Sequence, residues 1–264
     1  MIFAGIDAGS RTIKIVLVDT DRDMPEAVSR PCVIASGVID QGVEQDALAR
    51  RLLVDLLDRQ GLSMDDVDRI VATGYGRKLI ADADAAVTEI TCQAAGIASS
   101  LPDARTIVDI GGQDSKILRL TKSGTVHDFI MNDRCAAGTG RFLEVVATQL
   151  GVRLMQLGEM VDRSRNRVMI SNMCVVFAET EIVGLLAMGT PPEDIVAGVQ
   201  ASIASRVIAM AGGHIVSPVV FTGGVALVPG MAAALSSALG EEVHVAPHPQ
   251  ITCAHGAAIL ASRQ

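Results

Sequence analysis

The feature that most constrains the fold is an internal repeat. The segment "AGIDAGSRTIKIVLV" near the start of the chain is matched later by "VDIGGQDSKILRL". In each, an apolar run ends at an acid, Asp7 or Asp109, which small residues separate from a second apolar run. This pattern predicts two β-hairpins that carry an acid and glycines at the tip. We therefore expect two similar α/β lobes whose hairpin tips face one cleft.

The remaining elements alternate between apolar strands and segments with helical spacing. In the first half we expect a strand over 32–39, a helix over 44–61, a strand and turn over 67–76 and a helix over 87–101. In the second half we expect a hairpin over 106–121, helices over 138–151, 176–189, 192–212 and 230–240, strands over 218–226 and 242–247, and a last helix from about Ala254. Residues 1–101 would form lobe I, completed by helix 254–264, and residues 102–253 would form lobe II.

Charge and composition exclude several classes of function. The formal net charge is −8, and no cluster of Lys and Arg is visible, which argues against nucleic-acid binding. The uncharged stretch 215–240 is interrupted by Pro218 and by Gly223, which fits a strand, turn and helix better than a membrane span. The N-terminus lacks the pattern of a signal peptide, so we expect a cytoplasmic protein.

The two hairpin tips suit nucleotide phosphates. Glycines let backbone N–H groups approach phosphate oxygens, and nearby side chains can add further contacts. Asp7 and Asp109 suit a hydrated Mg²⁺ between carboxylate and phosphate. The candidate phosphate-binding residues are Gly9, Ser10, Arg11, Thr12 and Lys14 at the first tip, and Gly111 and Gly112 at the second.

A third glycine-rich turn, "FTGGVA" at 221–226, follows an apolar strand. Its Gly223 and Gly224 would let the backbone approach a purine ring or its ribose. No P-loop sequence is present, nor a dinucleotide-binding one that follows a strand and opens a helix. The three turns in this order resemble the actin-like ATPase superfamily. That resemblance implies a duplicated ribonuclease H-like fold, as in sugar kinases, actin and heat-shock chaperones, with ATP in the cleft, Asp7 and Asp109 near the metal and "TGGVA" at the adenosine.

Two of the five cysteines stand out. Cys135 in "NDRCAAGTGRFLE" and Cys174 in "SNMCVVFAETE" each precede a predicted helix, where the helix dipole favours a thiolate. Iron–sulfur clusters commonly take four cysteines, which a symmetric dimer would supply from two per chain. Gly138 and Gly140 let the Cys135 loop turn tightly. We expect Cys92 to be a core or interface residue, whereas the role of Cys253 stays open.

These stretches, with "GIDAGS", "DIGGQDSK" and "FTGGVA", resemble the ATP-dependent activators of 2-hydroxyacyl-CoA dehydratases and, more broadly, the ATPase subunits of benzoyl-CoA reductases. The resemblance covers essentially the whole chain. It implies an oxygen-sensitive homodimer in which Cys135 and Cys174 of each subunit hold one 4Fe-4S cluster. It also implies binding of ATP or ADP with Mg²⁺, hydrolysis that drives an electron into a dehydratase, and ferredoxin or flavodoxin as electron donor.

Alternative functions remain open at this point. Gln113 could orient the attacking water, and Asp114 beside it could serve as the general base of a small-molecule kinase such as a sugar kinase. In that case Cys135 and Cys174 would be buried structural thiols. A closer alternative is the ATPase subunit of a benzoyl-CoA-reductase-type enzyme, which pairs with an unlike subunit.

Overall fold

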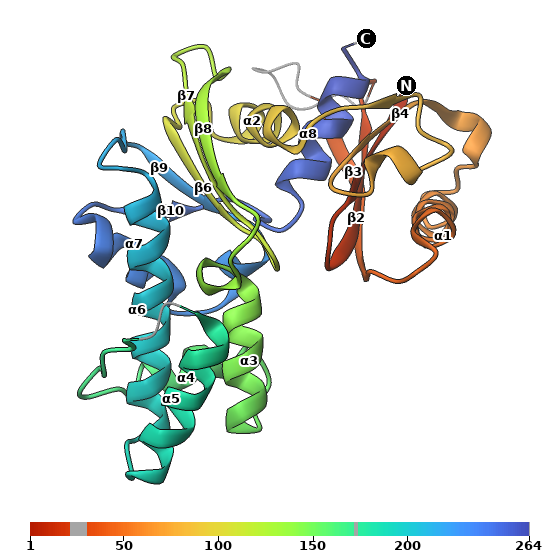
Figure 1. The fold of residues 1–264 in the computed structure, drawn as a ribbon. Helices are drawn as coiled ribbons and strands as arrows, with labels where there is room; N and C mark the ends of the chain where they lie inside the picture. Colours follow the sequence, from red (N-terminus) through yellow and green to blue (C-terminus); the bar gives the residue numbers. More distant parts are fainter. Residues whose placement is uncertain (22–30, 172–173, 264) are drawn as a thin grey trace. The chain divides into compact units, whose positions relative to one another are not determined.

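The computed structural model describes residues 1–21, 31–171 and 174–263. It divides the chain into two compact units. Unit 1 comprises residues 1–103, 120–126 and 251–264, and unit 2 comprises residues 104–119 and 127–250. Each unit is built on a mixed five-stranded sheet with helices (Figure 1), which confirms the expected α/β class.

Unit 1 contains the sheet β3-β2-β1-β4-β5. Strands β1, β2 and β3 are antiparallel neighbours, whereas β4 runs parallel to β1 and β5 parallel to β4. The bounds are Ile2–Ala8 for β1, Thr12–Asp19 for β2, Cys32–Asp40 for β3, Val67–Thr73 for β4 and Ala85–Ala86 for β5.

Helices cover both faces of this sheet, because its central strands are apolar on both sides. Along β1, Ala4 and Ile6 share a core with helix α1, while Phe3 belongs to a core with α2 and α8 on the other face. The helices are α1 (Gln45–Asp58), α2 (Glu89–Ser100) and α8 (Thr252–Ala261), with short 3-10 segments η1 (Met64–Asp66) and η2 (Arg77–Leu79).

The sheet of unit 2 repeats this topology. Its order is β10-β9-β6-β7-β8, which read from the other end matches the order in unit 1. Strands β6 and β7 are antiparallel, and β9 is parallel to both β6 and β10. The bounds are Thr106–Ile110 for β6, Ser115–Leu120 for β7, Val126–Asn132 for β8, Val219–Thr222 for β9 and Val243–Val245 for β10. The expected duplication is confirmed.

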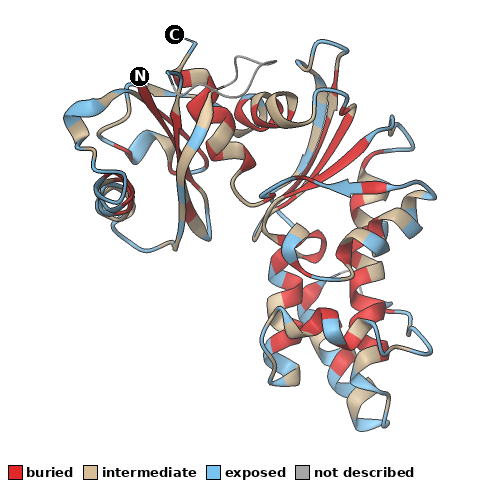
Figure 2. Cartoon of the chain, turned by 180° about the vertical axis from the view of Figure 1, so that it is seen from behind, coloured by how far each residue is buried: buried red, intermediate tan, exposed pale blue. Residues whose placement is uncertain are grey.

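One apolar core joins the helices of unit 2 to its sheet, and Phe142 and Phe221 are fully buried in it. Helix α6 packs against α3, α4, α5 and α7, and their inward faces carry the buried positions (Figure 2). The helices are α3 (Gly140–Leu150), α4 (Gln156–Val161), α5 (Val175–Ala187), α6 (Pro192–Met210) and α7 (Met231–Leu239), with 3-10 segments η3 (Ala136–Gly138) and η4 (Gly224–Leu227).

Two elements of unit 2 were not expected from the sequence. Strand β8 is the edge strand of its sheet, and it alternates half-buried and exposed residues that include His127 and Asp128. It therefore lacks the apolar run that marks a buried strand. Helix α4 has six residues, too few to show a helical period. None of the helices in the described ranges is both long and apolar enough to cross a membrane.

Helices α2 and α8 of unit 1 cross at glycines. A Cβ built on Gly96 would lie 2.1 Å from the Thr252 carbonyl oxygen, and one built on Gly256 would lie 1.7 Å from the Cys92 carbonyl oxygen. Both distances are far below a van der Waals contact, and the atoms approached are backbone. The pairing of these two helices therefore depends on glycine at both positions.

We predict that Gly256→Ala lowers the free energy of unfolding by about 3 kcal/mol, because helix α8 must move away from α2 to admit the methyl group. The measurement is urea denaturation followed by circular dichroism. Gly184→Ala in α5 is the matched control, since nothing lies within 4 Å of a Cβ there. Equal unfolding midpoints for the two variants would contradict the prediction.

Candidate functional site

The first hairpin tip places an acid beside a lysine. Asp7 near the end of β1 is in register with Lys14 on β2, and the Lys14 ammonium lies 3.0 Å from the Asp7 carboxylate. The side chains are 15% and 8% exposed for Lys14 and Asp7. An ion pair at this depth is shielded from solvent and from salt, so it is stronger than a surface pair.

The turn after Asp7 is tightly packed on this pair. The Gly9 N–H donates to the Thr12 carbonyl oxygen at 3.2 Å, and Gln41 donates to the Gly9 carbonyl oxygen at 2.8 Å. A Cβ on Gly9 would lie 2.9 Å from the Lys14 ammonium. Ser10 and Arg11 at the tip are exposed, so these two side chains are accessible to a ligand.

The second hairpin repeats the arrangement with an additional acid. Asp109 on β6 is in register with Lys116 on β7. The Lys116 ammonium lies 3.6 Å from the Asp109 carboxylate and 2.6 Å from that of Asp114, and its side chain is only 4% exposed. The Thr222 hydroxyl at the end of β9 donates to Asp109 at 3.0 Å. One buried ammonium thus holds two carboxylates.

Glycines allow the backbone to approach these carboxylates. A Cβ on Gly111 would lie 2.4 Å from an Asp114 carboxylate oxygen, and one on Gly223 would lie 2.7 Å from an Asp109 carboxylate oxygen. Gly223 also adopts φ +89°, which disfavours any other residue. The "TGGVA" turn therefore lies directly on the acid of the second hairpin. Gln113 is exposed at the tip of that hairpin.

The loop that follows Cys135 is bonded to the second hairpin. The Gly140 N–H donates to the Gly111 carbonyl oxygen and the Arg141 N–H to the Gly112 carbonyl oxygen, each at 2.9 Å. A Cβ on Gly140 would lie 3.1 Å from the Gly111 carbonyl oxygen, so glycine permits this close approach. The first turn of α3 is thereby attached to the glycines of "GGQD".

Cys135 and Cys174 are both exposed. The kinase alternative expected them to be buried, and this expectation is wrong. Cys174 is the N-cap residue of α5, as the sequence indicates. Cys135 instead precedes the three-residue segment η3, and α3 begins only at Gly140.

The helix-dipole argument therefore holds for Cys174 and fails for Cys135, because the dipole effect decays within the first turn of a helix. Asn132 holds the Cys135 backbone instead. Its side-chain oxygen accepts from the Cys135 N–H at 3.0 Å, and its amide donates to the Cys135 carbonyl oxygen at 2.7 Å.

The other cysteines have different surroundings. Cys92 is fully buried, and burial raises the pKa of its thiol to about 12, so it stays protonated and unreactive. The Cys253 thiol lies 3.7 Å from the Glu89 carbonyl oxygen, within the α2–α8 packing of unit 1. Across residues 1–21, 31–171 and 174–263 of one chain, no three His, Cys, Asp or Glu side chains converge on a metal position.

Sequence reasoning missed Lys116 and Thr222. A signal for Lys116 was present, because Asp109 and Lys116 have the same spacing as Asp7 and Lys14 in the repeat. In an antiparallel hairpin with turns of equal length, equal spacing predicts equal register. Thr222 carried no such signal, since its contact with Asp109 joins strands that are far apart in sequence.

Two sheets of one topology, each with an acid–lysine pair at a glycine turn, define a duplicated α/β protein of the actin-like ATPase type. The model of the BadF/BadG/BcrA/BcrD ATPase family matches residues 4–261. The chain belongs to this family.

Individual relatives are similar over nearly their whole length. The activator of lactoyl-CoA dehydratase from Anaerotignum propionicum is 41% identical over 262 residues, which cover 99% of this chain and 97% of that protein. The activator of 2-hydroxyisocaproyl-CoA dehydratase from Clostridium difficile, solved with bound ADPNP, is 38% identical with a TM-score of 0.90, covering 99% of this chain and 94% of that one. Component A of (R)-2-hydroxyglutaryl-CoA dehydratase from Acidaminococcus fermentans is 37% identical, also with a TM-score of 0.90, covering 100% and 98%.

The difference in thiol burial predicts selective alkylation. In cluster-free protein treated with iodoacetamide near pH 8, we expect Cys135 and Cys174 to be modified rapidly, because both are exposed. Cys92 should react only after unfolding, because burial raises the pKa of its thiol to about 12. Peptide mass spectrometry at successive times measures the three rates. Modification of Cys92 in the folded protein at the rate of Cys135 would disprove this expectation.

Proposed function

We propose that this protein is an ATP-hydrolysing activator that donates an electron to a 2-hydroxyacyl-CoA dehydratase. The observation that carries the proposal is the similarity to dehydratase activators over almost the whole chain, at up to 41% identity. The exposed Cys135 and Cys174 add the second requirement, an accessible site for a redox group. A benzoyl-CoA-reductase-type subunit is not favoured, because the relatives described above all serve dehydratases.

In this proposal the glycine turns bind nucleotide phosphates. Ser10, Arg11 and Thr12 would contact phosphate oxygens at the first turn, and the ammonium of Lys14 would add a positive charge. Gly111 and Gly112 would present backbone N–H groups at the second turn. The turn at Gly223 and Gly224 would approach the adenosine, since the absence of side chains there leaves the backbone accessible.

Mg²⁺ suits the carboxylates of these turns. It prefers oxygen ligands and keeps several waters, so one or two carboxylates are sufficient. Asp109 and Asp114 share a single ammonium, which leaves one negative charge among the three groups. We propose that Asp109, with Asp7 at the other turn, lies near the metal. Gln113 and Asp114 would orient the attacking water.

The residues also fit a shared 4Fe-4S cluster. Two exposed thiols per chain are half of the usual ligand set, and a symmetric dimer brings two such pairs to one axis. We propose that Cys135 and Cys174 of both subunits hold one cluster. When bound, the cluster would supply a carrier for a single electron. An accessible cluster of this kind would be sensitive to oxygen, and we place the protein in the cytoplasm, where thiols stay reduced.

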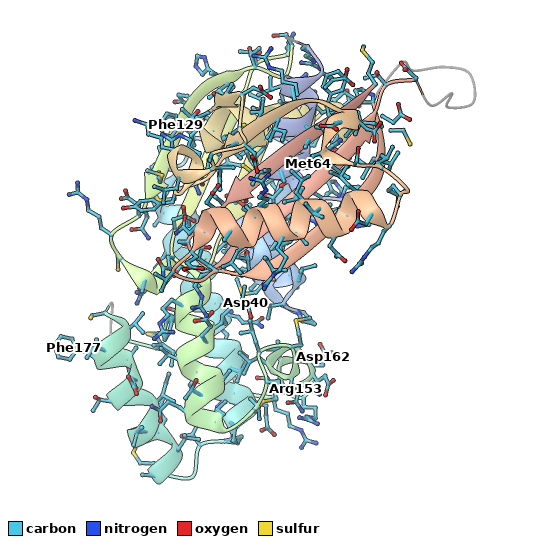
Figure 3. All side chains as sticks on the ribbon, turned by 90° about the vertical axis from the view of Figure 1, so that its right-hand side faces the viewer. Asp40, Met64, Phe129, Arg153, Asp162 and Phe177 are labelled. Carbon is cyan, nitrogen blue, oxygen red and sulfur yellow. The ribbon has the colours of Figure 1, made fainter. Side chains whose placement is uncertain are left out.

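An exposed apolar face next to Cys174 supports a subunit interface there. Val176 and Phe177 in the first turn of α5 are 67% and 65% exposed, and Val183 and Met188 further along are 49% and 77% exposed. Phe177 projects outward from α5 (Figure 3). Large apolar residues exposed along one helix are typical of a contact surface. The same region would also lie close to the dehydratase, with ferredoxin or flavodoxin as the donor that reduces the cluster.

The contacts of the Cys135 loop suggest how nucleotide could affect the cluster. The hydrogen bonds from Gly140 and Arg141 to Gly111 and Gly112 join the first turn of α3 to a phosphate-binding turn. Cys135 lies five residues before Gly140 in the same loop. A change at the "GGQD" turn between ATP and ADP would therefore be transmitted to the position of this thiol. We propose this loop as the link between hydrolysis and electron transfer.

Removing the charge of Asp109 tests the nucleotide part of the proposal. We expect Asp109→Asn to lower the Mg²⁺-dependent ATPase rate at least tenfold, which corresponds to ~1.4 kcal/mol of activation free energy. The measurement is phosphate release by the anaerobically purified protein. Asp103→Asn is the matched control, because Asp103 is exposed and lies outside the three glycine-rich turns. A rate unchanged by Asp109→Asn would refute the role of this acid.

Iron content tests the cluster part. Anaerobically purified protein should be brown, with about four irons per dimer, and should lose this colour in air. Cys135→Ala or Cys174→Ala should each remove the cluster from both subunits while nucleotide binding persists, whereas Cys32→Ala should retain full iron. Full iron content in either of the first two variants would refute the ligand assignment. A colourless protein that phosphorylates a sugar would refute the proposed function.

A further inference from the structure

Lys116 has no role in the proposed function so far, yet it is the most buried charged group of the nucleotide turns. It is 3% exposed. Its ammonium lies 2.6 Å from the Asp114 carboxylate and 3.6 Å from the Asp109 carboxylate. A buried lysine is costly unless carboxylates compensate its charge. Asp109 and Asp114 provide this compensation, and the three groups together carry a charge of −1.

The corresponding lysine of unit 1 differs in two respects. Lys14 contacts the carboxylate of Asp7, so this pair is neutral, and its side chain is 15% exposed against 4% for Lys116. Lys14 can thus contact a phosphate at the surface of its turn. Lys116 is held between two carboxylates below the surface. The two halves of the repeat therefore supply a phosphate-binding cation on one side and a surplus carboxylate charge on the other.

A divalent cation that binds at Asp109 or Asp114 must approach the ammonium of Lys116. Without nucleotide, its two charges would meet a group of charge −1 that already contains a cation, leaving a net positive charge in a poorly solvated place. The phosphates of ATP or ADP would supply the missing negative charge. Like-charge repulsion at these distances is strong where solvent is excluded.

We propose that Lys116 is a resident counter-ion that makes divalent-cation binding at Asp109 and Asp114 dependent on nucleotide. In the nucleotide-free protein the ammonium neutralises part of the carboxylate charge, so free Mg²⁺ binds weakly. The metal then enters with the nucleotide, as Mg²⁺–ATP. Lys116 acts through the two acids and is a positioning residue. The inference rests on the proposed nucleotide site, and it adds an order of binding to that site.

The test is a Mn²⁺ titration of the anaerobically purified protein without nucleotide, with free Mn²⁺ followed by its electron paramagnetic resonance signal. We expect Lys116→Met to bind Mn²⁺ at least tenfold more tightly than the wild type, because two carboxylates lose their counter-ion. Lys14→Met is the matched control and should gain less, since it frees one carboxylate. A Lys116→Met affinity within twofold of the wild type, or a gain equal to that of Lys14→Met, would overturn the inference.

Asp114→Asn provides a second test that does not leave a buried charge unpaired, because the Lys116–Asp109 contact remains. The Asp114 side chain is 28% exposed, so the fold should tolerate the change. We expect Mn²⁺ binding in the presence of ADP to weaken at least tenfold, while ADP binding in EDTA changes less than threefold. Unchanged Mn²⁺ binding with ADP would contradict the inference. A wild-type protein that binds no nucleotide at all would instead overturn the proposed function.

Discussion

The arrangement of both units depends on an acid–lysine pair held across an antiparallel hairpin. The register of β1 with β2 sets Asp7 opposite Lys14, and that of β6 with β7 sets Asp109 opposite Lys116. Each pair is largely buried, so neither partner can be removed without leaving an uncompensated charge. The glycine turns follow from this arrangement, because a side chain on Gly9 or Gly111 would meet the charged groups.

Duplication supplies two similar hairpins, and small differences between them separate their tasks. The second hairpin has an additional acid, Asp114, and its lysine is more deeply buried than Lys14. It also contacts two segments of unit 2, since Asp109 accepts from Thr222 and the glycines accept from the start of α3. The second hairpin is thus the place where the metal, the adenosine turn and the Cys135 loop are mechanically joined.

Sequence patterns were most informative where the chemistry is local. The positions of Asp7 and Asp109 at hairpin tips followed from the alternation of apolar runs and glycines, and the structure confirms both hairpins. Patterns were less informative for β8, whose half-exposed residues resemble a loop, and for the surroundings of Cys135. There the expected helix start is displaced by η3, a detail set by hydrogen bonds to Asn132 and to the second hairpin.

The sequence by itself determined the repeat, the α/β class and the identity of the two cysteines that stand apart, because spacing and residue type are local properties. Only the tertiary structure decided that Cys135 and Cys174 are exposed while Cys92 is buried. It alone showed that one ammonium, Lys116, serves two carboxylates. Burial and charge balance depend on which distant strands and helices surround a side chain, and this information is not contained in any single stretch of sequence.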